Sequence, residues 1–255
     1  MRVITWNVNG IRARASEVSA LCRRERPDVL CLQEIKATAA QVPEPLTLLP
    51  EYTSFWHGGP RGYSGVSLHV RRDRAAAPAF RAPPLDVEHR AIEAALGPLR
   101  VLSVYVPNGN RDLPGKIAFL EAMAGYARDA REAGDSLLVC GDLNVARTEA
   151  DVHPRMRNPN AVGQLPRERA LLEAILAEGL EDLGRAFDPE NQGLFTWWPP
   201  WREERQKNRG WRLDYVLASA PLARRATGCR VLGDFGTSDH APVLAELDVE
   251  LPGGA

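Results

Sequence analysis

One stretch constrains the fold more than any other: residues 136–144, Ser-Leu-Leu-Val-Cys-Gly-Asp-Leu-Asn. Its five small or apolar residues predict a strand buried on both faces, and the run stops at a glycine, a carboxylate and a carboxamide. Because side chains alternate along a strand, we expect Asp142 and Asn144 on one side of the sheet, at its carboxyl edge. Open α/β sheets bind ligands at that edge. A plain turn is the competing interpretation, since Gly, Asp and Asn all favour turns.

The first part of the chain repeats this pattern. Apolar strands are predicted at 2–8 and 28–32, joined by a helix at about 13–24, and polar residues close both strands. If the two strands are parallel, their carboxyl ends meet at one edge of the sheet. We therefore expect Asn7 and Glu34 to be neighbours.

The rest of the chain predicts further strands and two longer helices. Strand-like runs at 52–57, 66–71, 91–96 and 100–106 follow one another without a helix, which indicates antiparallel pairing and a mixed sheet. The Ala/Pro-rich piece 75–84 is expected to be a surface loop or an edge. The other predicted elements are helices at 115–131 and 167–178, a structureless loop at 145–166, and strands at 212–217, 229–232 and 241–249. The fold class is therefore α/β.

Composition limits size, partners and location. With 255 residues and 44% apolar content we expect one domain over residues 1–250 and a frayed tail at 251–255. The formal net charge of −1 gives no bulk attraction to a polyanion, so any basic surface must be local. The 4 cysteines are isolated, as expected of core residues in a reducing compartment.

The beginning of the chain and its apolar runs bear on location. A strand is predicted within two residues of Met1, which leaves no room for a signal peptide. No uninterrupted apolar run approaches the ~18 residues of a transmembrane helix. We expect a soluble, cytoplasmic monomer with no membrane partner.

Polar residues stand wherever a predicted apolar strand begins or ends: Asn7, Glu34, Asp142, Asn144, Asp214, Asp239 and His240. Each alone is more often scaffolding, whereas together they indicate one polar cleft. Carboxylates and carboxamides without thiolates suit a hard cation such as Mg²⁺, which would assist attack of water on a phosphodiester. Side chains of the adjacent Asp239 and His240 diverge on a strand, so Asp214 is the expected partner of His240.

A series of motifs now points to a family. In chain order they are Trp-Asn-Val-Asn-Gly-Ile-Arg-Ala (6–13), Leu-Gln-Glu-Ile-Lys (32–36), Tyr-Val-Pro-Asn-Gly (105–109), Gly-Asp-Leu-Asn-Val-Ala (141–146), Gly-Trp-Arg-Leu-Asp-Tyr (210–215) and Ser-Asp-His-Ala-Pro (238–242). The series resembles that of the exonuclease III family of AP endonucleases, within the endonuclease/exonuclease/phosphatase superfamily. It spans almost the whole chain and keeps the family's order.

The resemblance implies a single catalytic domain of this type, a four-layer α/β sandwich of two mixed β-sheets flanked by helices. It implies a Mg²⁺-dependent enzyme, with Mn²⁺ as the alternative, that cleaves duplex DNA 5′ to an abasic site. Many members also act as 3′-to-5′ exonucleases or 3′-phosphodiesterases. The partner would be DNA with abasic or 3′-blocked lesions, which would associate the protein with the nucleoid.

Carried over by motif, the resemblance assigns the metal site to Glu34, with Asn7 beside it and Asp239 as a further carboxylate. Asn9 stands where some relatives carry Asp, which leaves a second metal ligand open.

The remaining catalytic roles carry over in the same way. Asp142 would orient or deprotonate the attacking water and Asn144 would help to hold it. His240, paired with Asp214, would contact the scissile phosphate. The residues implied to contact phosphate or the leaving oxygen are Tyr105 and Asn108.

The aromatic segment matches the family's pocket for a flipped-out abasic sugar, with Trp197, Trp211 and Leu213 as its walls. Ordinary core packing is the alternative for each of them. Trp201 falls near the position of a duplex-wedging side chain. Basic residues at 153–169 and 201–212 could follow DNA phosphates, although a solvated loop face is the alternative. The other residues expected to contact DNA are Arg111, Lys207 and Asn208.

Two other functions stay open at this point. One is a phosphatase or diesterase of the same superfamily acting on a small or lipid phosphate. The other is a DNA-binding scaffold that has lost catalysis, against which every expected catalytic residue is present.

Overall fold

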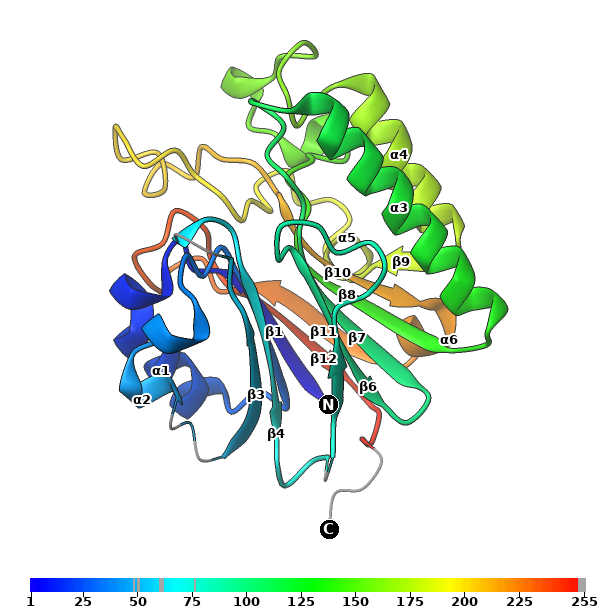
Figure 1. Ribbon diagram of the computed structural model, residues 1–255. Helices are drawn as coiled ribbons and strands as arrows, with labels where there is room; N and C mark the ends of the chain where they lie inside the picture. The colour runs from blue at the N-terminus through cyan, green and yellow to red at the C-terminus, as the bar shows by residue number, and fades with distance from the viewer. Residues whose placement is uncertain (48, 50, 60–61, 76, 252–255) are drawn as a thin grey trace.

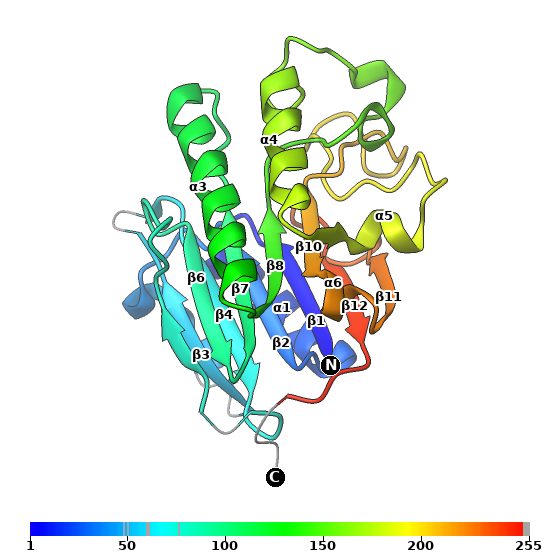
Figure 2. The same cartoon turned by 90° about the vertical axis from the view of Figure 1, so that its right-hand side faces the viewer.

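The computed structural model describes residues 1–47, 49, 51–59, 62–75 and 77–251. Two six-stranded sheets lie face to face (Figures 1 and 2). Helices α1 (Ile11–Glu25) and α2 (Glu44–Thr47) cover the outer face of one sheet, and α3 (Leu113–Glu132) and α4 (Pro166–Ala177) cover the outer face of the other. The predicted four-layer α/β sandwich of two mixed sheets is confirmed.

Each sheet combines strands from distant parts of the chain. The first sheet has the order β11 (Ala226–Val231), β12 (Val243–Leu247), β1 (Arg2–Asn7), β2 (Val29–Gln33), β4 (Val66–Arg71) and β3 (Tyr52–His57). The second has the order β5 (Ala79–Arg81), β6 (Ala91–Leu96), β7 (Leu99–Tyr105), β8 (Ser136–Asp142), β10 (Asp214–Ser219) and β9 (Leu180–Asp182). Two short helices, α5 (Leu183–Phe187) and α6 (Ala220–Ala223), flank the second sheet.

Strand direction brings many polar ends together. Among the described strands, β1 pairs in parallel with β2 and β7 with β8, and the other pairings are antiparallel. Helices α1 and α3 make the two crossovers that such parallel pairs require. Four strands therefore end at one edge of the sandwich, where the antiparallel strands β10 and β12 begin.

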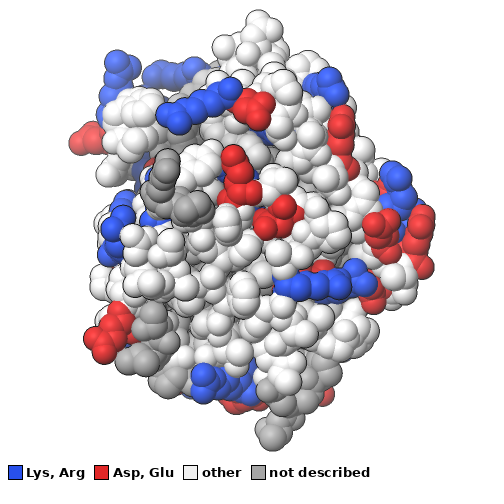
Figure 3. Space-filling model, in the orientation of Figure 1, with Lys and Arg blue, Asp and Glu red and all other residues white. Residues whose placement is uncertain are grey.

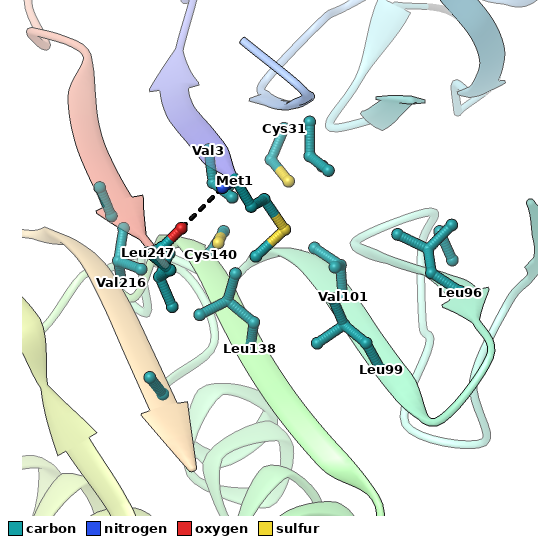
Figure 4. Close-up of a cluster of buried hydrophobic side chains, with 14 of the residues drawn as sticks. Met1, Val3, Cys31, Leu96, Leu99, Val101, Leu138, Cys140, Val216 and Leu247 are labelled. Atoms are coloured by element: carbon teal, nitrogen blue, oxygen red, sulfur yellow. Dashed lines mark hydrogen bonds between the residues drawn. The ribbon is translucent and has the colours of Figure 1, made fainter. Parts of the chain in front are cut away.

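Side-chain alternation decides which residues face the space between the sheets. In β1, Val3 packs between the sheets while Ile4 packs on the α1 side. In β8, Leu138 and Cys140 face inward. The same parity continues to the last residues of both strands, so the polar strand ends turn inward as well. Figure 4 shows part of this inter-sheet core and the 2.6 Å hydrogen bond from the Met1 amino group to the Leu247 carbonyl.

Between this core and the polar edge lies a hydrogen-bonded layer. The Thr5 hydroxyl donates to Gln33 Oε1 at 3.1 Å, and Gln33 Nε2 donates to Ser103 Oγ at 3.1 Å. All three side chains are fully buried. These hydrogen bonds satisfy polar groups whose burial would otherwise cost free energy. The space between the sheets is thus lined by apolar side chains in the core, by hydrogen-bonded neutral polar side chains next to it, and by charged groups at the edge.

Several predicted boundaries need correction. The loop at 145–166 contains two 3₁₀ helices, Glu149–Asp151 and Pro154–Met156, because Asp151 accepts from Thr148 and Pro154 sets a helical backbone angle. Residues 75–84 include the edge strand β5, which agrees with the expectation of a surface loop or an edge. Leu251 is buried in the inter-sheet core, so the tail does not fray from 251, and residues 252–255 lie outside the described part of the chain. The strand predicted at 212–217 starts at Asp214.

Among the described residues, none of the helices combines the length and the apolar composition needed to cross a membrane. The short elements α2, α5, α6 and β9 have too few residues to show a period in the sequence.

Candidate active site

The first cluster at the sandwich edge joins the two sheets. Asn7, the last residue of β1, donates from Nδ2 to Glu34 Oε2 at 3.0 Å and to Asp142 Oδ2 at 2.9 Å. Asn7 and Asp142 are buried, whereas Glu34 is partly open to solvent. The predicted proximity of Asn7 and Glu34 is confirmed, and Asn7 links the ends of the two parallel strand pairs.

The turn after β8 returns Asn144 to the carboxylate of Asp142. Asn144 donates to Asp142 twice, from its backbone nitrogen to Oδ1 at 2.8 Å and from Nδ2 to Oδ2 at 3.2 Å. The two side chains meet as predicted, but the strand ends at Asp142, and Asn144 has a left-handed φ of 50°. A turn, not strand alternation, makes the contact, so the turn and the polar site are the same feature. Glu34 leaves β2 in the same way, with a φ of 54°. Such conformations are rare outside glycine and gather at functional sites.

The buried histidine is held by a carboxylate. His240 Nδ1 lies 2.8 Å from Asp214 Oδ2, which confirms the predicted pairing, and His240 Nε2 lies 3.9 Å from Asp142 Oδ2. The register of β8 and β10 explains why Asp214, His240 and Asp142 lie in a row. Asp214 is the first residue of β10, and it pairs directly with Asp142 on β8. Burial alone would lower the pKa of His240, but the charges of Asp214 and Asp142 raise it to about 10. The imidazole is therefore protonated at neutral pH.

The environment of Asp142 favours a proton acceptor. Burial and the charge of Asp214 raise the pKa of Asp142 to about 7, while His240 and the hydrogen bonds from Asn144 and Asn7 oppose the rise. A carboxylate that titrates close to neutral pH is suited to take a proton during a reaction.

Asp239 is held at the mouth of the site by two donors. Asn9 Nδ2 donates to Asp239 Oδ1 at 2.8 Å, and Trp197 Nε1 donates to Asp239 Oδ2 at 3.1 Å. Although burial opposes the change, His240 and these two donors lower the pKa of Asp239. Asp239 therefore remains an anion beside the other oxygen groups.

The oxygen groups fit a hard cation. Lys36 Nζ lies 2.7 Å from Glu34 Oε1 and 2.6 Å from Asn9 Oδ1, so positive charge already occupies the space between these oxygens. Carboxylate and amide oxygens without sulfur are the donors that Mg²⁺ and similar ions prefer.

A second group, Asp142, Asp214 and His240, also has ligand atoms within 4.8 Å of one another. Because His240 Nδ1 is engaged by Asp214 and the ring is protonated, that group suits proton handling and the Glu34 side suits the ion.

An open cleft of about 680 Å³ extends from the site on the side of β7. Tyr105, Asn108 and Arg111 line it together with Glu34. Asn108 Nδ2 lies 3.4 Å from Asn144 Oδ1, while Arg111 is exposed on the wall. Burial and the charges of Glu34 and Asp142 raise the pKa of Tyr105, which keeps its hydroxyl protonated.

The three predicted pocket residues lie together. Trp197 and Trp211 meet edge to face with ring centroids 5.6 Å apart, and Leu213 belongs to the same apolar cluster. Both tryptophans are only half-buried, unlike core aromatics, and Trp211 Nε1 has no hydrogen-bond partner among the described residues. An isolated β-bridge between Trp197 and His240 joins this aromatic cluster to the edge of the sandwich that carries Asp142, Asp239 and His240, which we call the catalytic edge.

Three further predicted DNA-contact residues, Trp201, Lys207 and Asn208, are in the loop 199–210. Trp201 is 59% exposed and is the most exposed large hydrophobic side chain described. Lys207 is exposed and donates to the Arg202 carbonyl at 2.7 Å. Asn208 holds the loop itself, accepting from Trp198 Nε1 at 3.1 Å and donating to the Gly193 carbonyl at 3.0 Å. Contacts of these residues with DNA stay a prediction.

Sequence reasoning missed two residues beside the site. Arg90 is buried with its guanidinium 4.8 Å from the centre of the Tyr105 ring, and it lines the same cleft. Lys116 is completely buried beneath the turns that carry Asn108 and Asn144. No local pattern marks either residue, because each is a single basic residue whose burial depends on distant segments.

This arrangement defines an enzyme that hydrolyses phosphodiesters, since it places a proton acceptor, a protonated histidine and a cation-binding group around one point. The chain belongs to the Endonuclease/Exonuclease/phosphatase family, whose sequence profile matches residues 4–240. The match begins in β1 and ends at His240, so it includes every residue of the catalytic edge.

Individual relatives match over nearly the full length. The chain is 32% identical to the DNA repair nuclease APEX1 of Danio rerio, over 98% of this chain and 83% of the relative. It is 32% identical to an exodeoxyribonuclease of Bacillus subtilis (strain 168), over 98% of this chain and 100% of the relative. Among solved structures, an AP endonuclease from Archaeoglobus fulgidus superposes with a TM-score of 0.87 at 28% identity, covering 98% of this chain and 100% of that one.

Proposed function

We propose that this protein is a metal-dependent DNA repair nuclease that hydrolyses the phosphodiester on the 5′ side of an abasic site in duplex DNA. One hydrogen bond carries the proposal. Trp197 Nε1, in the half-buried aromatic cluster of Trp197, Trp211 and Leu213, donates to Asp239 Oδ2 in the candidate active site at 3.1 Å. An apolar pocket that adjoins the reacting phosphate can hold a base-free sugar while it excludes an intact nucleotide. The names of the relatives support a DNA substrate.

In this proposal Asp142 and Asn144 handle the attacking water. The Asp142 carboxylate would accept a proton from the water, and the two hydrogen bonds from Asn144 fix its orientation. Asn7 donates to the same carboxylate from the other side. Asp142 is thus held in place by hydrogen bonds while its pKa stays high enough for proton transfer.

His240 would face the phosphate. Its protonated ring donates from Nδ1 to Asp214 and leaves Nε2 directed toward the Asp142 side of the site. A charged donor at this place stabilises negative charge that develops on the phosphoryl oxygens. Tyr105 and Asn108, on the cleft side, would contact the phosphate or the leaving oxygen.

Glu34, Asp239 and the amide of Asn7 or Asn9 would hold the metal ion, which we propose is Mg²⁺. When bound, such an ion neutralises charge on the phosphate and on the leaving oxygen. In the described part of the chain the oxygen donors on this side of the site are carboxylates and amides, which favours Mg²⁺, with Mn²⁺ as the substitute.

Local charge would supply affinity for the DNA backbone. Figure 3 shows the face of the molecule that is turned to the viewer in Figure 1. Acidic and basic side chains are interspersed on it, and Lys and Arg gather at the upper left, where long loops extend in Figure 1. Exposed Trp201 lies in one of these loops and would act as a wedge between base pairs. We further propose that the protein acts as a monomer on chromosomal DNA in the cytoplasm.

The test is cleavage of a duplex oligonucleotide with one tetrahydrofuran lesion, in Mg²⁺ or in EDTA. We expect a single incision 5′ to the lesion that requires the metal and is lost in Asp142→Asn. Trp211→Ala should lose incision while its melting temperature stays close to wild type, and Trp211→Phe should keep part of the activity. Absence of metal-dependent incision by pure wild-type protein would overturn the proposal, and cleavage of small phosphate esters instead would favour a phosphatase.

A 3′-to-5′ exonuclease activity is the second candidate. The specific observation is the wide cleft of about 680 Å³ beside Tyr105, which is open and not closed around a single sugar. An exodeoxyribonuclease is among the relatives. Incubation with an undamaged duplex that has a recessed 3′ end separates the two activities, because an exonuclease yields a ladder of shortened strands.

A further inference from the structure

Lys116 is a charged residue in an unusual place. It is fully buried on α3, between the apolar residues of that helix and the ends of β7 and β8. Its ammonium group lies 2.5 Å from Glu168 Oε1 on α4, 2.7 Å from the Asn144 carbonyl and 3.2 Å from the Asn108 carbonyl. The ammonium group therefore donates to the two carbonyls and forms an ion pair with the Glu168 carboxylate.

One carbonyl belongs to Asn144, which donates to the catalytic carboxylate of Asp142, and the other belongs to Asn108, whose Nδ2 lies 3.4 Å from Asn144 Oδ1. Asn144 follows β8 and Asn108 follows β7, and the two segments are hydrogen-bonded to each other where they leave the sheet, from Val106 N to the Asp142 carbonyl and from Asn144 Nδ2 to the Val106 carbonyl, both at 2.9 Å. Gly109, with a φ of 88°, lies against Lys116 so closely that an added Cβ would be 2.7 Å from Lys116 Cδ. Lys116 therefore adds a second link between the two turns, at the carbonyls of Asn108 and Asn144.

Glu168 extends the connection to the aromatic cluster. Its second oxygen accepts from the backbone nitrogens of Gly163, at 2.6 Å, and Leu165, at 3.0 Å. Gly163 lies against the Trp211 ring, 3.0 Å from where its Cβ would be, and its carbonyl accepts from Ala146 at 2.8 Å. One buried ion pair thus reaches both the water-handling turn and the aromatic wall.

We propose that the Lys116–Glu168 ion pair is a positioning device that fixes Asn108 and Asn144 relative to each other and to Trp211. The proposal rests on the proposed nuclease function. A purely structural role would not need a charge here, because a buried ion pair replaced by apolar residues of similar volume is often neutral or stabilising. An apolar pair could not donate hydrogen bonds to the Asn108 and Asn144 carbonyls, as Lys116 does.

The test compares Lys116→Met, the double variant Lys116→Met/Glu168→Leu and Lys116→Arg with wild type. The double variant leaves no charge unpaired, so we expect it to melt above the single variant Lys116→Met, although below wild type because the Asn108 and Asn144 carbonyls and the Gly163 and Leu165 amides lose their partners. Its kcat for lesion incision should fall about 100-fold with KM little changed, the size expected when catalytic groups shift by about 1 Å. The single variant should melt lower, since it leaves Glu168 buried without its cation.

Two measurements keep the proposal falsifiable if a variant fails to fold. Lys116→Arg keeps the charge but moves the donors, so it should fold and still lose kcat, and a wild-type kcat in both Lys116→Arg and the double variant would overturn the proposal. As a control, Arg71→Met removes an ion pair with Asp28 at the opposite end of the sheet and should leave kcat unchanged. The side-chain amide signals of Asn108 and Asn144 in NMR spectra should shift in the double variant, and unchanged signals would overturn positioning whether or not the wild type cleaves DNA.

Discussion

Trp197 Nε1 donates to Asp239 Oδ2 across 3.1 Å, and this bond joins the aromatic cluster to the carboxylates of the catalytic edge. Asp239 receives its other hydrogen bond from Asn9, at 2.8 Å. Each donor stabilises the charged carboxylate and restricts its rotation. A side chain that would touch the sugar therefore also orients a group that would bind the metal, so lesion binding and metal binding should be coupled.

Trp197→Phe separates the two roles of this residue, because phenylalanine keeps an aromatic wall and loses the donor. We expect the Mg²⁺ concentration for half-maximal incision to rise about 10-fold, the usual effect of removing a partner that orients a metal ligand. Titration of the incision rate with Mg²⁺ measures this. Trp198→Phe is the matched control, since Trp198 donates to Asn208 and not to a carboxylate. An equal rise in both variants would contradict the prediction.

Asp214→Asn should change the pH dependence of incision. Asp214 is the largest influence that raises the pKa of His240, to about 10, so the protonated ring persists to high pH in the wild type. Without that charge the pKa falls, and the protonated ring is lost at a lower pH. We expect the alkaline limb of the pH–kcat profile to move to lower pH by about one unit or more, with a lower maximum. An alkaline limb that stays in place would show that His240 is not the titrating group.

The strand ends were predictable from sequence because each shows an abrupt change from apolar to polar residues. Asn7 and Glu34 close two apolar runs joined by a helix, so their meeting at one edge followed from parallel strand direction. The contact of Asn7 with Asp142 joins strands of different sheets, so it also needed the packing of the two sheets. The pairing of Asp214 with His240 followed from alternation, which directs Asp239 away from the histidine.

Contacts that depend on the path of loops were not predictable. Trp197 reaches Asp239 only because an isolated bridge places its backbone beside His240. Lys116 gave no signal, since a lysine on an amphipathic helix normally points to solvent and only the fold reveals a buried partner on α4. The left-handed turn at Asn144 was likewise hidden, because Gly-Asp-Leu-Asn fits both a turn and a strand end.

His69 should make folding stability depend on pH. Burial lowers its pKa to about 3, and its ring nitrogens lie 2.8 Å from the hydroxyls of Ser54 and Ser67, which satisfy a neutral ring. Between about pH 6.5 and 3 the unfolded chain binds one more proton at this residue than the native protein. The free energy of unfolding should therefore fall as pH decreases through this window, by up to ~1.4 kcal/mol per pH unit.

Urea unfolding of wild type and His69→Gln at several pH values checks this contribution. Glutamine can bond to both serines and does not titrate, so the variant should lose less stability than wild type between pH 6.5 and 4. The difference between the two free energies of unfolding should shrink as pH decreases. Curves that remain parallel over this range would show that His69 does not cause the dependence.

Asn9→Asp should increase the response of the protein to divalent cations. Asn9 Nδ2 donates to Asp239, and Asn9 Oδ1 accepts from Lys36 at 2.6 Å. An aspartate at this position loses the donor and places a second negative charge beside Asp239, which the single charge of Lys36, shared with Glu34, offsets only in part until a divalent cation binds. In EDTA the variant should melt below the wild type, and Mg²⁺ should raise its melting temperature more. Thermal melts across a Mg²⁺ titration, without DNA, measure both effects, and Asn160→Asp, on an exposed loop, is the control that should respond as wild type does. An equal Mg²⁺-dependent rise in all three proteins would mean that residue 9 lies outside the region that holds the ion.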